Sequence, residues 1–271
     1  MDSPPIMRLA VAADDNFVTH ASVVARSMGG MHVAEQPDLT LVDSGLPCDT
    51  FNFVCRARLT PESTDRRIAE AVSYFDAVDR PFSWWVGPAD QPCHLGDRLV
   101  EAGLERTGTE LAMAAELDRL PDGTSAPDHL EIRRVATTAD LERFALILAA
   151  NWTPPDPDVL RFYERAASIV LGSACAQRLY LGFLGNEPVA TAEITLGGGV
   201  GGVYNVSTRG PFRRRGIGTA VTLQPLLEAR AEGLRIGVLQ AAAEGVGLYA
   251  RLGFRAFGDI TEYKPPPSAS A

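Results

Sequence analysis

The chain has 271 residues and a formal net charge of −9 at pH 7, with 46% hydrophobic and 22% charged residues. These values are ordinary for a globular protein, and the length allows one large domain or two small ones. The acidic balance argues against nucleic acid as a partner, because binding to a phosphate backbone needs a basic face. No stretch is long and apolar enough to span a bilayer, so we expect a cytoplasmic protein with no membrane partner.

The first 120 residues predict a helix followed by alternating strands and helices. Apolar residues at helical spacing indicate an amphipathic helix over residues 7–28, with a break expected near Asp14. A second helix is expected to begin at Thr60, the N-cap, with Pro61 in the first helical position. The other elements expected in this half are strands over 39–42, 51–59 and 83–86, a short helix over 95–102, and a strand after Gly103.

A segment rich in proline and glycine, residues 121–127, predicts a linker between two halves. Residues 265–271, at the other end of the second half, predict a disordered tail. The elements expected between them are a strand over 130–135, helices over 137–150 and 158–171, strands over 178–184, 189–196 and 203–208, a helix from Gly216 to near Gly233, and a strand over 234–240.

Cysteine and histidine spacing indicates no metal or disulfide chemistry. The four cysteines are scattered without close pairs, so we expect free thiols and no metal cofactor. The histidines all lie in the first half or next to the linker, far in sequence from the motifs described next, so histidine catalysis is not expected. They are His20, His32, His94 and His129.

A basic loop lies between the strand over 203–208 and the helix that follows it. Three consecutive arginines, residues 213–215, lead into a Gly-x-Gly at Gly216 and Gly218. Glycines let a phosphate approach the free N–H groups of a helix N-terminus, and arginines add charge-assisted contacts. The alternative is a solvated basic helix start with two incidental glycines. The strand before and the strand after the helix form a β-α-β unit, which favours a pyrophosphate site.

The run Arg213-x-x-Gly216-x-Gly218 resembles the acetyl-CoA pyrophosphate loop of the GNAT superfamily of N-acetyltransferases, Gln/Arg-x-x-Gly-x-Gly/Ala. The later run over 248–254, Leu-Tyr-Ala-Arg-Leu-Gly-Phe, is similar to the C-terminal Leu-Tyr-x-x-x-Gly-Phe element of that superfamily. The two motifs occur in the usual order and at the usual separation. The resemblance implies an α/β fold with a mixed sheet, the acyl-CoA N-acyltransferase fold, and acetyl-CoA as co-substrate.

The resemblance also implies roles for individual residues. The end of the strand would hydrogen-bond the pantetheine arm and the loop amides would hold the pyrophosphate, while a bulge near Asn205 would open a slot for the thioester. Tyr249 matches the general acid of the superfamily, and a phenol with a pKa near ~10 is protonated at neutral pH. The position often taken by a pantetheine-binding asparagine is Ala242 here. The expected cofactor-binding residues are Val206, Ser207, Thr208, Arg213, Arg214, Arg215, Gly216, Ile217, Gly218 and Thr219.

Glu193 is the one acidic residue in an otherwise apolar strand, residues 189–196. If the carboxylate is buried, its pKa is expected to rise, which suits a general base acting directly or through water. The alternative is a solvent-facing side chain on an edge-like strand. Glu193 and Tyr249 are therefore the two candidate catalytic residues.

The order of elements in the first half recurs in the second half with a shift of 150 residues. Pro61 falls on Pro211, and Gly103 falls on Gly253. This order predicts a divergent tandem duplication in which the first copy is truncated and has lost the loop and the tyrosine, because Leu99 stands at the position of Tyr249. The expected domains are 1–120, a degenerate copy, and 128–264, the catalytic copy.

The leading hypothesis is an N-acetyltransferase that moves an acetyl group from acetyl-CoA to an amine of a small molecule by direct attack in a ternary complex. The first alternative is acetylation of a protein lysine or N-terminus, with the first half as a docking module. The second is a CoA-binding regulatory module without turnover. The acceptor, the length of the acyl chain and the oligomeric state are left open by the sequence.

Overall fold

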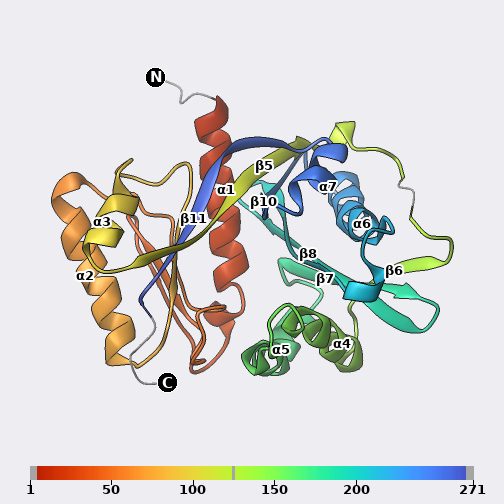
Figure 1. Cartoon of the computed structure of the whole chain (residues 1–271), viewed down its shortest axis with the longest axis horizontal. Helices are drawn as coiled ribbons and strands as arrows, with labels where there is room; N and C mark the ends of the chain where they lie inside the picture. Colours follow the sequence, from red (N-terminus) through yellow and green to blue (C-terminus); the bar gives the residue numbers. More distant parts are fainter. Residues whose placement is uncertain (1–4, 124–125, 267–271) are drawn as a thin grey trace.

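A computed structural model describes residues 5–123 and 126–266 of the chain. Its strands form one mixed sheet of 11 strands in the order β1-β2-β3-β4-β11-β5-β10-β9-β8-β7-β6. Figure 1 shows two lobes along this sheet, with helix α1 between them. Helices α2 and α3 belong to the lobe formed by the first half, and α4 to α7 belong to the other lobe. The expected mixed α/β sheet is confirmed.

The elements lie close to their predicted positions. Those of the first half are α1 (Pro5–Ser22), β1 (His32–Glu35), β2 (Thr40–Asp43), β3 (Phe53–Cys55), α2 (Pro61–Ala77), β4 (Ser83–Val86), α3 (Leu95–Glu101) and β5 (Glu105–Glu116). Those of the second half are β6 (Leu130–Arg134), α4 (Thr138–Ala149), α5 (Pro157–Val170), β7 (Gln177–Leu184), β8 (Glu187–Gly197), β9 (Val200–Thr208), α6 (Ile217–Ala231), β10 (Ile236–Ala241), α7 (Val246–Arg251) and β11 (Arg255–Lys264).

The predicted tandem arrangement is visible in the pairing of the strands. In the first half β1, β2 and β3 are antiparallel neighbours and β3 pairs with β4 in parallel. In the second half β7, β8 and β9 repeat this pattern, and β9 pairs with β10 in parallel. Strand β6 and helix α4 have no counterpart before α1 among the described residues.

The two copies exchange their last strands. Strand β5 of the first half pairs with β10 of the second, and β11 of the second half pairs with β4 of the first. Figure 1 shows β5 and β11 crossing between the lobes side by side, and they pair along most of their length. The division at residues 121–127 stays a prediction, and residues 124–125 of it lie outside the described residues. Most of the predicted tail, residues 267–271, also lies outside the described residues. The exchange places a strand from before this linker inside the second copy's sheet.

Helix α1 is continuous, so the predicted break near Asp14 is wrong. Asp14 is accommodated within the helix because its carboxylate forms an ion pair with Arg58 at 2.7 Å. Two residues later the helix faces the second copy, where the fully buried Asn16 side chain donates hydrogen bonds to the carbonyls of Thr195 and Val200 at 2.9 and 3.0 Å. The first helix of the chain therefore covers strands β8 and β9 of the second half.

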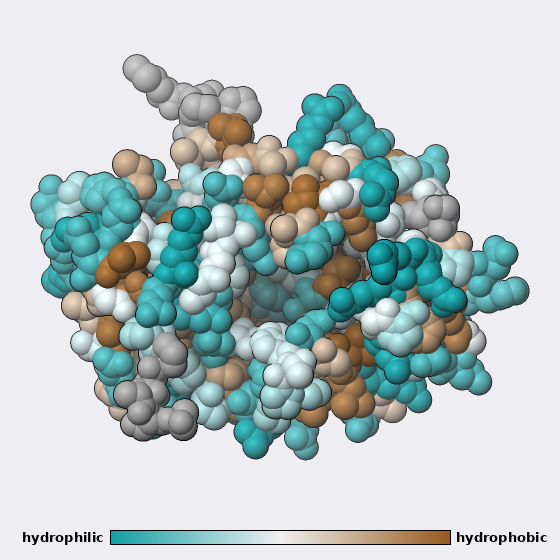
Figure 2. Space-filling model, viewed as in Figure 1, coloured by the Kyte–Doolittle hydropathy of each residue, from teal (hydrophilic) through white to brown (hydrophobic). Residues whose placement is uncertain are grey.

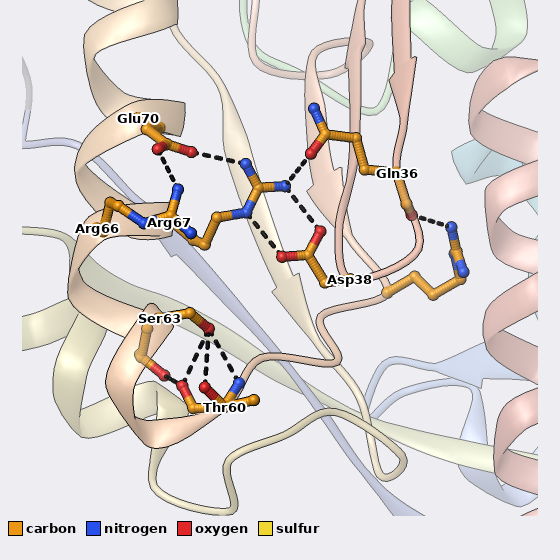
Figure 3. A network of polar contacts seen from close by, with 9 residues as sticks. Gln36, Asp38, Thr60, Ser63, Arg66, Arg67 and Glu70 are labelled. Atoms are coloured by element: carbon orange, nitrogen blue, oxygen red, sulfur yellow. Dashed lines mark hydrogen bonds and ion pairs between the residues drawn. The ribbon is translucent and has the colours of Figure 1, made fainter.

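Helix α2 begins as its sequence predicts. Thr60 is the N-cap, Pro61 is the first helical residue, and the Thr60 N–H donates to the Ser63 hydroxyl at 3.0 Å. One turn later Arg67 binds the Asp38 carboxylate at 2.9 Å, and its other guanidinium nitrogens bind Gln36 and Glu70 (Figure 3). This network fastens α2 to the loop between β1 and β2, so the first copy is a well-packed scaffold although it lacks the glycine loop.

Candidate active site

Strands β9 and β10 separate partway along their length. Their parallel pairing runs from Gly237 opposite Gly201 to Leu239 opposite Val203 and then ends. The pairing of β9 with β8 shifts register just beyond this point, and Asn205 has a φ of 52°. The predicted bulge near Asn205 is thus confirmed. Because a bulge bends its strand, β9 and β10 diverge beyond Val203, and we call the region between their unpaired ends the slot.

The glycine loop connects the end of β9 to helix α6. Arg214 and Gly216 have φ values of 59° and 80°, and α6 begins immediately after Gly216. The Arg213 side chain donates from Nε to the Thr208 carbonyl at 2.9 Å, which fixes the loop against the strand. Residues 213–215 are exposed, and in the described part of the chain none of them forms an ion pair with a carboxylate. Their charge is therefore available to an anion at the start of α6.

The second glycine of the loop is needed for packing. A Cβ on Gly218 would lie 3.1 Å from the Leu248 side chain and 3.6 Å from the Thr208 hydroxyl oxygen. Gly218 thus lets the first turn of α6 approach both α7 and the end of β9. Ser207, in that strand end, donates to the Asn151 side chain at 2.9 Å. The ten residues predicted to bind the cofactor therefore fall in two segments, the end of β9 and the loop with the first turn of α6, and their role stays a prediction.

Tyr249 lies in α7 and is half-buried. Its ring packs edge-on against Phe254, with the ring centroids 6.1 Å apart. Burial, together with the negative charge of Glu110, raises the pKa of Tyr249 to about 12. The phenol therefore stays protonated at neutral pH and retains a proton that it can donate.

Glu193 lies in β8 directly opposite Tyr204 of β9, and only 1% of it is exposed. The alternative of a solvent-facing side chain is therefore wrong. Burial by itself raises the pKa of Glu193, but the charge and hydrogen bond of His20 and further hydrogen bonds from Thr195 and Asn205 lower it below the ordinary value. The expected rise in pKa is thus also wrong, and a carboxylate with a lowered pKa is a weak proton acceptor.

His20 is the residue that sequence reasoning missed. Its Nδ1 lies 2.7 Å from Oε1 of Glu193, and its ring stacks on Tyr204 with centroids 3.8 Å apart. The expectation that histidines lie far from the site is wrong, because α1 crosses onto the second copy and carries His20 with it. The only signal in the sequence was the amphipathic pattern of α1, which shows that a helix face is buried but not what covers it.

A narrow pocket lies beside the slot on the side covered by α1. Strand residues Val238, Leu239 and Gln240 border it, and the first half contributes Asp14, Phe17, Trp85 and Asp90. Its free space is about 30 Å³, close to the volume of one water molecule. Figure 2 shows that the molecular surface is also hollowed in the middle of the face in view, between α7 and α5.

Two carboxylates and an arginine form one wall of this pocket. Arg58 binds Asp14 at 2.7 Å and Asp90 at 2.8 Å. Burial, with the neighbouring Asp14, raises the pKa of Asp90 to about 8, and burial also raises the pKa of Asp14. The indole N–H of Trp85 is buried and has no hydrogen-bond partner within the described residues.

Residues 141–254 match the model of the acetyltransferase (GNAT) family. The C-terminal part of the chain belongs to the GNAT family. None of the curated proteins matches the chain. The GNAT match begins in α4 and ends before β11, so it leaves out α1, the first half and the exchanged strands.

Solved structures match nearly the whole chain. A GCN5-related N-acetyltransferase from Kribbella flavida has a TM-score of 0.72 at 19% identity, with 94% of this chain and 97% of that chain covered. A GCN5-related N-acetyltransferase from Sphaerobacter thermophilus has a TM-score of 0.60 at 17% identity, with coverage of 96% and 91%. A tandem GNAT protein from the clavulanic acid biosynthesis pathway has a TM-score of 0.58 at 16% identity, with coverage of 95% and 97%. These likenesses show a tandem GNAT fold.

The presence of metal-binding clusters, disulfides and membrane-spanning helices can be judged for residues 5–123 and 126–266. Within these ranges no cluster of three His, Cys, Asp or Glu side chains could hold a metal ion. The four cysteines are free. None of the helices in these ranges has the length and apolar character of a membrane span.

Proposed function

We propose that the protein transfers an acetyl group from acetyl-CoA to an amine of a small molecule, by direct attack in a ternary complex. The observation that carries the proposal is the slot between β9 and β10 with an unpaired arginine loop at its border. A slot holds an extended pantetheine arm beside free strand edges, and the loop presents N–H groups and cationic side chains to a pyrophosphate. GNAT membership supports an acyl-CoA donor.

The reaction needs a bound thioester, a neutral amine and a proton for the leaving thiolate. Residues 206–208 would bind the pantetheine arm, and residues 213–219 would bind the pyrophosphate. The amine nitrogen forms a bond to the thioester carbon, the carbon–sulfur bond breaks, and the thiolate takes a proton. Tyr249 is the candidate donor of that proton because its phenol is protonated at neutral pH.

The narrow pocket supports a small acceptor over a protein. It is enclosed by α1 and by strands of both copies. Aromatic rings line this pocket and suit the small cationic end of an amine. A regulatory CoA-binding module would not need the half-buried phenol of Tyr249, so we favour the enzyme.

The proposal is tested by titrating the purified full chain with acetyl-CoA in a calorimeter. The double variant Arg214→Glu, Gly216→Glu should lose at least about 100-fold in affinity, because charge-assisted hydrogen bonds are each worth about 1.5–3 kcal/mol. The control is Arg8→Glu, Gly29→Glu, which makes the same charge change at two exposed positions away from the loop and should bind as the wild type does. Failure of the wild type to bind acetyl-CoA, or equal binding by the loop variant, refutes the proposal.

A further inference from the structure

His20 is held in a fixed orientation with one ring nitrogen free. A carboxylate only accepts hydrogen bonds, so the 2.7 Å contact with Glu193 places a proton on Nδ1 of His20. Stacking on Tyr204 fixes the ring plane, and Gln177 donates to the His20 carbonyl at 2.7 Å. Nε2 forms no hydrogen bond within the described residues and is not among their buried unpartnered atoms, so it reaches solvent. His20 can therefore accept a proton at Nε2.

Glu193 links His20 to the opening of the slot. Its Oε1 binds His20, while its Oε2 accepts a hydrogen bond from Asn205 at 2.8 Å. Asn205 is the bulge residue with positive φ, at which β9 leaves β10. Thr195 donates a further hydrogen bond to Oε1 at 2.7 Å, so the buried carboxylate is fully partnered. The imidazole thus lies next to the place where the two strands separate.

Other titratable groups around the pair stay neutral near pH 7. They are Tyr204 on β9, Tyr163 on α5 and Cys175 before β7, and burial raises the pKa of each, with the charge of Glu193 adding to the rise. Glu193 itself keeps its negative charge because its hydrogen bonds outweigh its burial and lower its pKa. The pair therefore combines one permanent anion with one imidazole.

We propose that Nε2 of His20 takes the proton from the acceptor amine and that Glu193 is the residue that positions the imidazole. This inference rests on the proposed function. As the nitrogen–carbon bond forms, the N–H proton moves to Nε2, the carbon–sulfur bond breaks, and the thiolate takes a separate proton from the phenol. The imidazolium then releases its proton to water, and the phenolate takes a proton from water. The first copy, without a cofactor loop of its own, contributes the proton acceptor through α1.

The competing explanation is that His20 only tethers α1 to β8. A tether would affect stability, whereas a proton acceptor affects the rate and its pH dependence. The matched control is His32, an exposed histidine that also stacks on a tyrosine, Tyr74, with ring centroids 5.6 Å apart, but in the first lobe.

The test compares the full-length wild type, His20→Ala and His32→Ala with acetyl-CoA and three probe amines, 2-phenylethylamine, spermidine and L-lysine, by thiol release. With the probe amine that the wild type acetylates fastest, we expect His20→Ala to lose at least about 100-fold in kcat and to bind acetyl-CoA as the wild type does. The variant should also lose the acid-side limb of the pH–rate profile, and added imidazole should restore part of its activity. His32→Ala should behave as the wild type. If His20→Ala does not fold, His20→Asn, which can still donate to Glu193, takes its place with the same loss of kcat and of the acid-side limb expected.

Two results separate the failures. If the wild type turns over and the His20 variant keeps its kcat or the acid-side limb of its pH–rate profile, the role of His20 is overturned and the proposed function stands. A wild type that binds no acetyl-CoA and releases no thiol with any probe overturns the proposed function, and the role of His20 with it.

Discussion

Replacing Asn16 with alanine should strongly destabilise the protein, although Asn16 lies in the first helix and far in sequence from the sheet that it contacts. Its side-chain amide donates to the carbonyls of Thr195, Gly197 and Val200 at 2.9–3.0 Å, and its Oδ1 accepts from the Tyr204 hydroxyl at 2.8 Å. The residue is 0% exposed, so water does not replace these partners.

The loss can be estimated from these contacts. The two amide hydrogens are worth about 1 kcal/mol each, and leaving the buried Tyr204 hydroxyl unpaired costs about 1–2 kcal/mol, so the free energy of unfolding should fall by about 3 kcal/mol. For a chain of this size that corresponds to a fall in Tm of about 6–12 °C. The measurement is urea unfolding followed by circular dichroism, with Asp15→Ala as the control at an exposed neighbouring position. A loss below about 1 kcal/mol, or one equal to that of the control, would show that α1 is not anchored through Asn16.

Two further predictions follow from the fold and the site. Tyr249→Phe should lower kcat by about 10²–10⁴-fold without changing the affinity for acetyl-CoA. Because burial and Glu110 raise the pKa of Tyr249 to about 12, the wild-type rate should not fall between about pH 8 and 10 through loss of the phenol proton. A fall in that range that is absent from the phenylalanine variant would contradict the raised pKa. Phe75 in the first lobe and Leu226 in the second are both 0% exposed, and replacing either with alanine should lower the free energy of unfolding by about 2–5 kcal/mol. Because β5 and β11 are exchanged between the copies, each variant should shift one unfolding transition that both lobes share. Calorimetry that resolves two transitions, only one of which moves in each variant, would show that the lobes unfold separately.

The features that the sequence alone determined are those encoded in short stretches. The glycine loop needs a residue that tolerates positive φ at Gly216, and the structure gives 80° there. The capped start of α2 follows from Thr60, Pro61 and Ser63, which are neighbours in the chain. The mixed sheet and its tandem copies could be predicted from the order of strands and helices, because that order reflects local hydrophobic patterns and turn residues.

The features that only the tertiary structure decided are contacts between residues far apart in the chain. A buried helix face does not reveal its partner, so the pattern of α1 could not show that His20 meets Glu193, 173 residues away. The pKa of Glu193 could not be predicted for the same reason, because its direction depends on donors supplied by another element. The exchange of β5 and β11 was equally hidden, since a strand with a suitable pattern can pair with either copy's edge, and only packing of the whole chain selects which one.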